Sequence, residues 1–334
     1  MADKQALNAT FFAFRKREKG GVLLGATLAY AVLAIVLGGL FFFLNAQGIM
    51  DYVNWVTNLS MSAGAGKPGA PPSMEMMMPP AGVMSLIPAY ILFILFYYVL
   101  FAAYEAACLR WLIRGETGGL LGLTLGADTW RVYFGYWVWL FLLIAFYIVC
   151  AIVVGGTIFS MAAVMQGDMS NAGPAVAIVP PAVAIVPFVL VLVLLIGLLY
   201  FGVRFAPAAA TSIARRRFAF FDAWKVTKGR LWPLFGAYLL LFLMYVVAAI
   251  VIAMAFGALI GANVAGQMGG LGAAPPETPE AAFRAFATPQ MLASVVAVYA
   301  LILGVVLVFV VSLFGVNARA AQAALEEGRI QAAT

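Results

Sequence analysis

Residues 231–262 read LWPLFGAYLLLFLMYVVAAIVIAMAFGALIGA, a stretch without a single charged residue. It belongs to one of six charge-free runs, each longer than the roughly 20 residues that a helix needs to cross a bilayer core. The runs are apolar on every face rather than alternating, which excludes barrel strands. Backbone polar groups in lipid must be satisfied internally, so we predict an all-α, polytopic integral membrane protein. Its six transmembrane helices are expected near residues 21–45, 85–109, 132–158, 180–206, 231–262 and 290–317.

Composition supports the membrane class and argues against catalysis. The 334 residues are 65% hydrophobic and only 10% charged, whereas a soluble domain is nearer half apolar and a quarter charged. The chain has no histidine, which removes the usual proton shuttle and the commonest metal ligand. We therefore expect a single membrane domain over residues 1–334 that is not an enzyme and needs no cofactor.

The basic residues predict the orientation. Of 19 Lys and Arg residues, only Lys67 and Arg284 fall in the three loops on one side of the predicted membrane. Positive loops stay in the cytoplasm, so we expect a multi-pass protein of the bacterial inner membrane with cytoplasmic N- and C-termini. The net charge of +6 is then a topology signal and requires no nucleic acid. Cations at helix ends meet anionic lipid headgroups at about 1 kcal/mol each, which makes membrane lipids the expected partners.

Residues 128–135 and 222–229 form an internal repeat. At an offset of 94, Asp, Trp, Val and Gly coincide, and Arg131 aligns with Lys225. Asp can cap a short helix, Trp suits the headgroup boundary, the cation can snorkel, and Gly permits a turn. We predict cytoplasmic interfacial elbow helices that bind lipid at these positions. The elbow residues are Asp128, Trp130, Arg131, Gly135, Arg215, Arg216, Arg217, Asp222, Trp224, Lys225 and Gly229.

The repeat predicts an architecture of three pseudo-repeated hairpins. A degenerate third copy of the motif precedes the first helix, which gives repeats over about 8–112, 122–208 and 216–319. The outer loops 46–83 and 262–285 contain low-complexity stretches rich in Gly, Ala and Pro. Such stretches cannot pack a core, so we expect both loops to be flexible.

The second copy of the motif carries a family resemblance. Arg215–Arg217, Phe220, Asp222–Lys225 and Thr227–Arg230 lead into an apolar helix through Leu231, Trp232, Leu234 and Phe235. With the helix spacing, this run resembles the six-helix membrane domain associated with bacterial glycerophosphoryl diester phosphodiesterases, in its stand-alone form. In fused relatives the diesterase chemistry belongs to a separate soluble barrel and uses histidine. The resemblance therefore implies a lipid-related membrane role without diesterase activity.

A possible intramembrane polar site comprises Glu105, Arg110 and Arg204. Glu105 is the only acidic residue well inside an apolar run, and burying a carboxylate in a membrane costs roughly 3 kcal/mol or more, so it is a functional candidate. Alternatively, Glu105 lies near the cytoplasmic boundary and pairs with Arg110 or Arg204. Arg204 itself is either a substrate ligand or a snorkelling anchor.

The first outer loop also contains a methionine cluster, Met74, Met76, Met77 and Met78. Thioethers select Cu(I), although methionine also serves as adaptable apolar filler. Three functional hypotheses follow. The leading one is a non-enzymatic protein that binds lipid, partner membrane proteins or further copies of itself. The second is a transporter or channel for an amphiphile or small solute, and the third is Cu(I) handling through the Met-rich loop.

Overall fold

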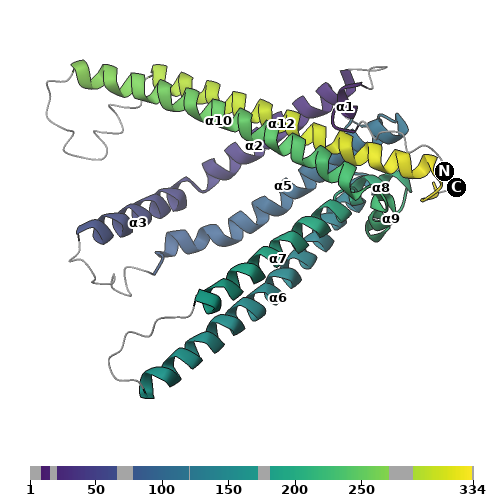
Figure 1. Cartoon of the computed structure of the whole chain (residues 1–334). Helices are drawn as coiled ribbons and strands as arrows, with labels where there is room; N and C mark the ends of the chain where they lie inside the picture. Colours follow the sequence, from purple (N-terminus) through teal and green to yellow (C-terminus); the bar gives the residue numbers. More distant parts are fainter. Residues whose placement is uncertain are drawn as a thin grey trace. The chain divides into compact units, whose positions relative to one another are not determined.

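The computed structural model describes residues 9–15, 21–65, 78–119, 121–171, 181–270 and 289–332, and the regular elements in these ranges are helices (Figure 1). Their bounds are α1 Phe12–Arg15, α2 Gly21–Leu44, α3 Ala46–Ala65, α5 Ala81–Arg114, α6 Ala127–Asn171, α7 Pro181–Phe205, α8 Ala208–Ala214, the 3-10 helix η1 Phe220–Asp222, α9 Ala223–Thr227, α10 Leu231–Gly270 and α12 Pro289–Glu326.

Six membrane-spanning helices are confirmed by length and composition. In the described part of the chain, six segments are long and apolar enough to cross a bilayer, and they lie in α2, α5, α6, α10, α12 and, together, α7 and α8. Several helices continue beyond the predicted ends, because backbone hydrogen bonding does not stop where hydropathy falls. Helix α5 runs to Arg114, where Gly115 takes a left-handed φ of 70° and its N–H bonds Trp111 O at 3.0 Å.

The first outer loop differs from the prediction. Residues 46–65, expected as part of a flexible loop, form helix α3. The prolines of this region begin only at position 68, so nothing interrupts the helical ladder before then. The hydroxyl of Thr57 donates to Val53 O at 2.7 Å and so finds a partner within the helix. On the other predicted loop, α10 continues to Gly270, and residues 66–77 and 271–285 lie outside the described residues.

The chain divides into two compact units. One comprises residues 19–111 and 115–141, and the other comprises residues 1–18, 112–114 and 142–334. This division differs from the three predicted repeats, which stay a prediction.

Aromatic side chains join α2 to α5 in the unit of residues 19–141. Tyr30 stacks on Tyr104 with ring centroids 4.5 Å apart, and its hydroxyl shares a 2.8 Å hydrogen bond with Tyr97. Thr27 and Tyr104 share another hydrogen bond of 2.9 Å. Lipid tails are as apolar as the helices, so packing and hydroxyl pairs of this kind, rather than the hydrophobic effect, hold membrane helices together.

The other unit is organised around α12. Helices α10 and α12 lie side by side, and α1, α8 and α9 also pack on α12 (Figure 1). Along the α10–α12 interface, the Tyr245 and Phe309 rings pack at a tilt with their centroids 4.8 Å apart, and the Tyr238 hydroxyl donates to Asn317 Oδ1 at 2.6 Å. Helix α1 approaches α12 closely at Gly315. A Cβ there would lie 2.9 Å from both the Cβ and the amide nitrogen of Ala13.

This close approach predicts that Gly315→Ala loosens α1 from α12. The added methyl group overlaps Ala13, and overpacking of this kind costs about 1–3 kcal/mol. Trypsin cleavage after Arg15, at the end of α1, should therefore accelerate about tenfold, which corresponds to roughly 1.4 kcal/mol. Gly257→Ala on α10 is the matched control, because a Cβ at Gly257 meets nothing within 4 Å. Equal cleavage rates in the two variants would contradict the proposed packing.

Candidate functional site

A platform of short helices, defined as residues 208–229, connects α7 to α10. Helix α8 is rich in small residues and almost fully buried, and it packs on α12. Its hydroxyls bond locally. Thr211 donates to Pro207 O at 2.8 Å and Ser212 to Ala208 O at 2.9 Å, while Ser212 Oγ accepts the Ala219 N–H at 3.1 Å. These bonds satisfy the polar groups of a buried segment and fix the turn from α8 toward η1.

The second predicted elbow is a short helix followed by a glycine turn. Helix α9 contains Trp224 and Lys225, and Gly229 takes a φ of +76° before α10 begins. Most residue types avoid this conformation, so glycine permits the turn here. The first predicted elbow differs. Asp128, Trp130, Arg131 and Gly135 lie inside the continuous helix α6, because nothing at Gly135 breaks the helical ladder.

The two motif copies nevertheless share one local feature. Asp128 accepts a hydrogen bond from Arg131 at 2.6 Å, and the aligned Asp222 pairs with Lys225 at 3.0 Å. Each is a pair three residues apart on a helical turn. In both copies the tryptophan between them is exposed.

Asp222 is held by cations rather than acting as a helix cap. Its carboxylate pairs with Arg215 as well as Lys225, and it makes no side-chain cap bond to α9, so the predicted capping role is wrong. Partial burial alone would raise the pKa of Asp222. The hydrogen bond and charge of Lys225, with the charges of Arg215 and Arg217, outweigh burial, and the pKa of Asp222 lies below its ordinary value.

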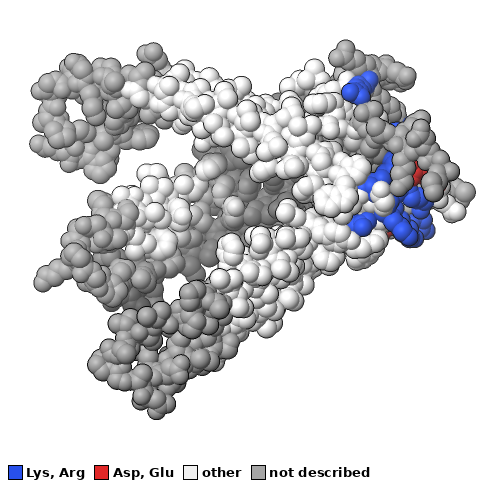
Figure 2. All heavy atoms as spheres, viewed as in Figure 1, with Lys and Arg blue, Asp and Glu red and all other residues white. Residues whose placement is uncertain are grey.

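The outer surface of the platform is both basic and aromatic. Lys225 is 65% exposed and Trp224 38% exposed. Further exposed side chains are Arg216, Arg217, Phe218, Phe221 and Lys228. In Figure 2 most of the visible Lys and Arg atoms gather near α8 and α9 and a smaller group lies near α1, whereas the visible surfaces of α10 and α12 are uncharged along most of their length. Aromatic rings beside cations are typical of the membrane headgroup region.

Arg204 ties α7 to this platform. Its Nε donates to the Tyr200 hydroxyl at 3.2 Å and its Nη1 to Thr227 Oγ1 at 3.3 Å. The guanidinium also lies 4.7 Å from the Trp224 ring centroid, a cation–π distance. Arg204 therefore holds the ring of the exposed Trp224 against the last turn of α7.

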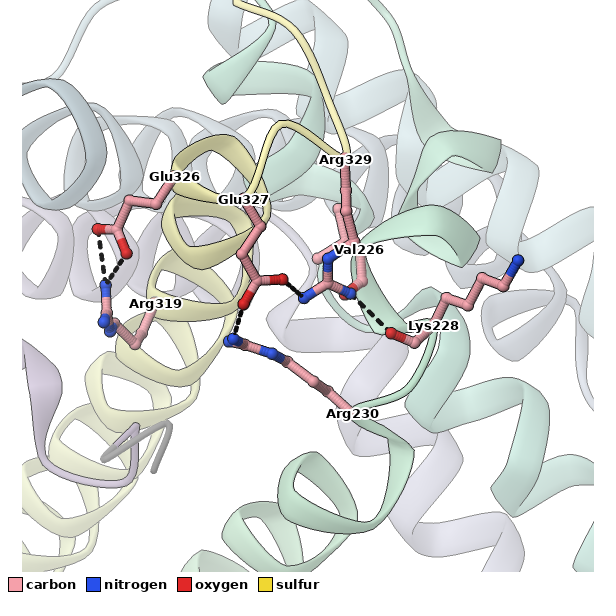
Figure 3. Close-up of polar contacts among 7 residues, drawn as sticks. All are labelled: Val226, Lys228, Arg230, Arg319, Glu326, Glu327 and Arg329. Atoms are coloured by element: carbon pink, nitrogen blue, oxygen red, sulfur yellow. Dashed lines mark hydrogen bonds and ion pairs between the residues drawn. The ribbon is translucent and has the colours of Figure 1, made fainter. Parts of the chain in front are cut away.

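Sequence reasoning missed a polar network in which residues that follow α12 contact the end of α9 and the residue before α10 (Figure 3). Arg329 Nη1 donates to the carbonyls of Val226 at 3.1 Å and Lys228 at 2.6 Å, which caps the end of α9. Arg329 also pairs with Glu327, and Glu327 pairs with Arg230 at the start of α10. The available sequence signal was the adjacent acidic pair Glu326 and Glu327 in a tail expected to be basic.

A second arginine caps α8 in the same way. Arg114 Nη1 donates to Ile213 O at 3.1 Å, near the end of α8. Gln322 of α12 donates to Leu112 O at 2.9 Å and so holds the last turn of α5. Arg114 of α5 and Arg329, which lies beyond the end of α12, thus cap the two short helices α8 and α9.

The predicted intramembrane polar site has different partners from those expected. Glu105 is 6% exposed and accepts a hydrogen bond from the Tyr136 hydroxyl. Arg110 Nη2 instead donates to Gly122 O at 3.0 Å. Arg204 has the partners given above, so the expected pairing of Glu105 with Arg110 or Arg204 is replaced by the Glu105–Tyr136 pair.

The methionine cluster lies mostly outside the described residues. Met74, Met76 and Met77 fall there, and Met78 is exposed. In the part of the chain that the structure describes, no three His, Cys, Asp or Glu side chains come together in a geometry that could hold a metal ion. The Cu(I) hypothesis stays a prediction.

Comparison with protein-family models, curated proteins and solved structures finds no match to this chain.

The buried Glu105–Tyr136 pair predicts a stability loss in Tyr136→Phe. Removing the hydroxyl leaves a buried carboxyl group without its donor, which costs about 1–3 kcal/mol. Thermal unfolding in detergent should show a lower midpoint, and a Tyr136→Phe/Glu105→Met double variant should recover most of the loss. Tyr98→Phe is the control, because Tyr98 is exposed and its ring lies 6.0 Å from that of Tyr136. A double variant no more stable than the single one would argue against this pairing.

The ion pairs of Asp222 predict a pH-dependent contribution to stability. Because its pKa is lower in the folded protein than in the unfolded chain, the contribution is complete above the ordinary Asp value of about 4. It is lost as the pH falls below that value and through the lowered pKa. The difference in unfolding midpoint between the wild type and Asp222→Asn should therefore be constant from pH 7 to 5 and shrink below about pH 4. A difference that grows on acidification would have the wrong sign.

Proposed function

We propose that this protein is a non-enzymatic, multi-pass protein of the bacterial inner membrane that binds anionic lipid through the basic and aromatic platform. In this proposal both termini are cytoplasmic and the platform lies on the inner leaflet. The supporting observation is that the neighbouring residues Trp224 and Lys225 are both exposed on a short helix. The Arg204 guanidinium lies against the Trp224 ring. A partner membrane protein or a second copy with an acidic surface is the alternative occupant of the same face.

The cations of the platform differ in how strongly they are paired and how far they are exposed. Arg215, Arg230 and Arg329 make ion pairs with acidic side chains. Lys225 and Lys228 are exposed, and Lys225 also pairs with Asp222 at 3.0 Å. Each cation near an anionic leaflet contributes about 1 kcal/mol, and the amphipathic Trp ring anchors at the same depth. The platform therefore has the composition for lipid contact, with exposed lysines beside an exposed tryptophan.

The resemblance to the membrane domain associated with glycerophosphoryl diester phosphodiesterases is consistent with a lipid-related role and belongs to the same proposal. Its carrying residues lie in and next to the platform. The chain lacks histidine, which that hydrolysis uses, so the proposal includes no diesterase activity.

A transporter for an amphiphile is the second candidate, and Glu105 favours it. Carboxyl groups inside membrane spans mark many transport paths. Ala102, Ala106 and Leu109 on the same helix are 0% exposed, however, so they border no water-sized space in this conformation. Transport would require an opening at Glu105, whereas lipid binding at the platform requires none.

The lipid proposal predicts that Trp224→Ala/Lys225→Ala loses anionic lipid without a change of topology. Native mass spectrometry after gentle extraction should show retained phosphatidylglycerol on the wild type and less on the variant. Retention by the wild type should also fall as salt rises, because the Debye length is about 10 Å at 0.1 M salt and about 3 Å at 1 M.

Lys225→Arg is the matched control, since it keeps the charge. It should retain lipid like the wild type. Equal retention by the double alanine variant and the wild type would refute the platform as the lipid site, and a retained protein in place of lipid would favour the alternative occupant.

A further inference from the structure

An apolar groove lies between α10 and α12, and α1 closes one of its ends. The groove has a volume of about 470 Å³, within the range of roughly 300–1,000 Å³ typical of ligand sites. Its floor and walls come from both long helices, and Phe14 of α1 and Phe11, which precedes α1, line the end nearest Ser312. It belongs entirely to the unit that also contains the platform.

The lining offers almost no hydrogen-bonding groups. Ser312 lines the groove, and its hydroxyl donates a hydrogen bond to Val308 O of the same helix at 2.7 Å. The Tyr245 ring packs against that of Phe309, with the centroids 4.8 Å apart. A polar solute would give up its hydrogen bonds to water in such a groove without gaining others, which is unfavourable. Hydrocarbon is the chemistry that the lining accepts.

The dimensions match one leaflet. The groove extends along α12 from Ala300 to Ser312, which at 1.5 Å per residue is about 18 Å. Half of a bilayer hydrocarbon core is about 15 Å. Both walls are membrane-spanning segments, so the surroundings supply acyl chains directly. One extended chain from a single leaflet fits this length.

The end formed by α1 is suited to a headgroup. Arg15, the last residue of α1, is exposed beside Phe14. Helix α1 is held there by the close contact of Ala13 with Gly315, and the Arg319 guanidinium lies 6.0 Å from the Phe12 ring centroid. A cation at the mouth of a hydrocarbon groove complements a phosphate attached to an acyl chain.

We propose that this groove binds one acyl chain of an anionic phospholipid, with α1 closing the headgroup end and Arg15 beside the phosphate. The inference rests on the proposed lipid function but assigns the chain-binding site to a different surface from the platform. It therefore predicts a lipid held in a fixed place, in addition to headgroups bound by charge alone.

Gly304 provides the variant that tests the groove. It lines the groove, and a Cβ at this position meets nothing within 4 Å, so Gly304→Leu fills the groove without a backbone collision. Gly257→Leu on α10 is the matched control, because Gly257 is equally open and exposed but does not line the groove. Gly304→Ala is a milder second variant, and all three should unfold at the temperature of the wild type.

The full-length protein is reconstituted in vesicles of phosphatidylcholine with phosphatidylglycerol that carries a photoreactive diazirine in one acyl chain. Labelled peptides are identified by mass spectrometry. We expect wild-type labelling concentrated on residues 241–248 and 300–312, and a fall of about threefold or more in Gly304→Leu, since the filled groove removes the contacts that hold the chain. Gly304→Ala should lie between, and Gly257→Leu should match the wild type.

Several results would overturn the groove proposal. The first is that the groove is labelled no more than the exposed face of α2. The second is unchanged labelling in Gly304→Leu, and the third is crosslinks from the groove to a protein segment instead of lipid. The Trp224→Ala/Lys225→Ala variant separates this inference from the proposed function. Groove labelling and lipid retention that both persist in this variant would refute the platform alone. Retention that the wild type shows and this variant loses, with no groove labelling in the wild type, would refute the groove alone.

Discussion

The absence of water in the bilayer core is the constraint on which this structure depends. Every backbone polar group there must be satisfied within its own segment, so each span is a continuous helix. Burial of apolar surface gives little association between such helices, because lipid is equally apolar. Specific contacts must therefore come from shape, aromatic stacking and a few hydroxyl pairs. The Tyr30–Tyr104 stack and the Tyr238–Asn317 hydrogen bond are contacts of this kind.

The charged groups at the ends of the helices are subject to the same constraint. Arg114 and Arg329 donate to carbonyls at the ends of short helices, which water would otherwise satisfy. Arg215 and Arg230 are balanced by acidic partners. These arginines thus hold the platform together, whereas Lys225 and Lys228 are exposed, with Lys225 also paired to Asp222. In the lipid proposal, one set of basic residues would both stabilise the platform and present charge to a leaflet.

The sequence predicted features that depend on one helix at a time and missed those that depend on two. Hydropathy predicted the six spans because crossing a bilayer is a property of a single segment. It did not predict that Glu327 pairs with Arg230, because 97 residues separate them. Glu105 was predicted either as an intramembrane carboxylate or as a boundary residue paired with an arginine, whereas its partner is Tyr136 on the next span. Helix α3 was missed because a low-complexity average hid a helical stretch before the first proline.

Helix α12 links the two proposed lipid contacts, and two of its glycines have opposite roles. At Gly315 the missing side chain lets α1 approach closely, whereas at Gly304 it leaves space that nothing in the described chain fills within 4 Å. The same helix contacts α8 and α9 of the platform. A lipid chain beside Gly304 would stabilise the α10–α12 pair, and the platform packs on the latter helix. Binding at one surface would thus favour the helix arrangement that supports the other, which gives a physical reason for both to lie on one unit.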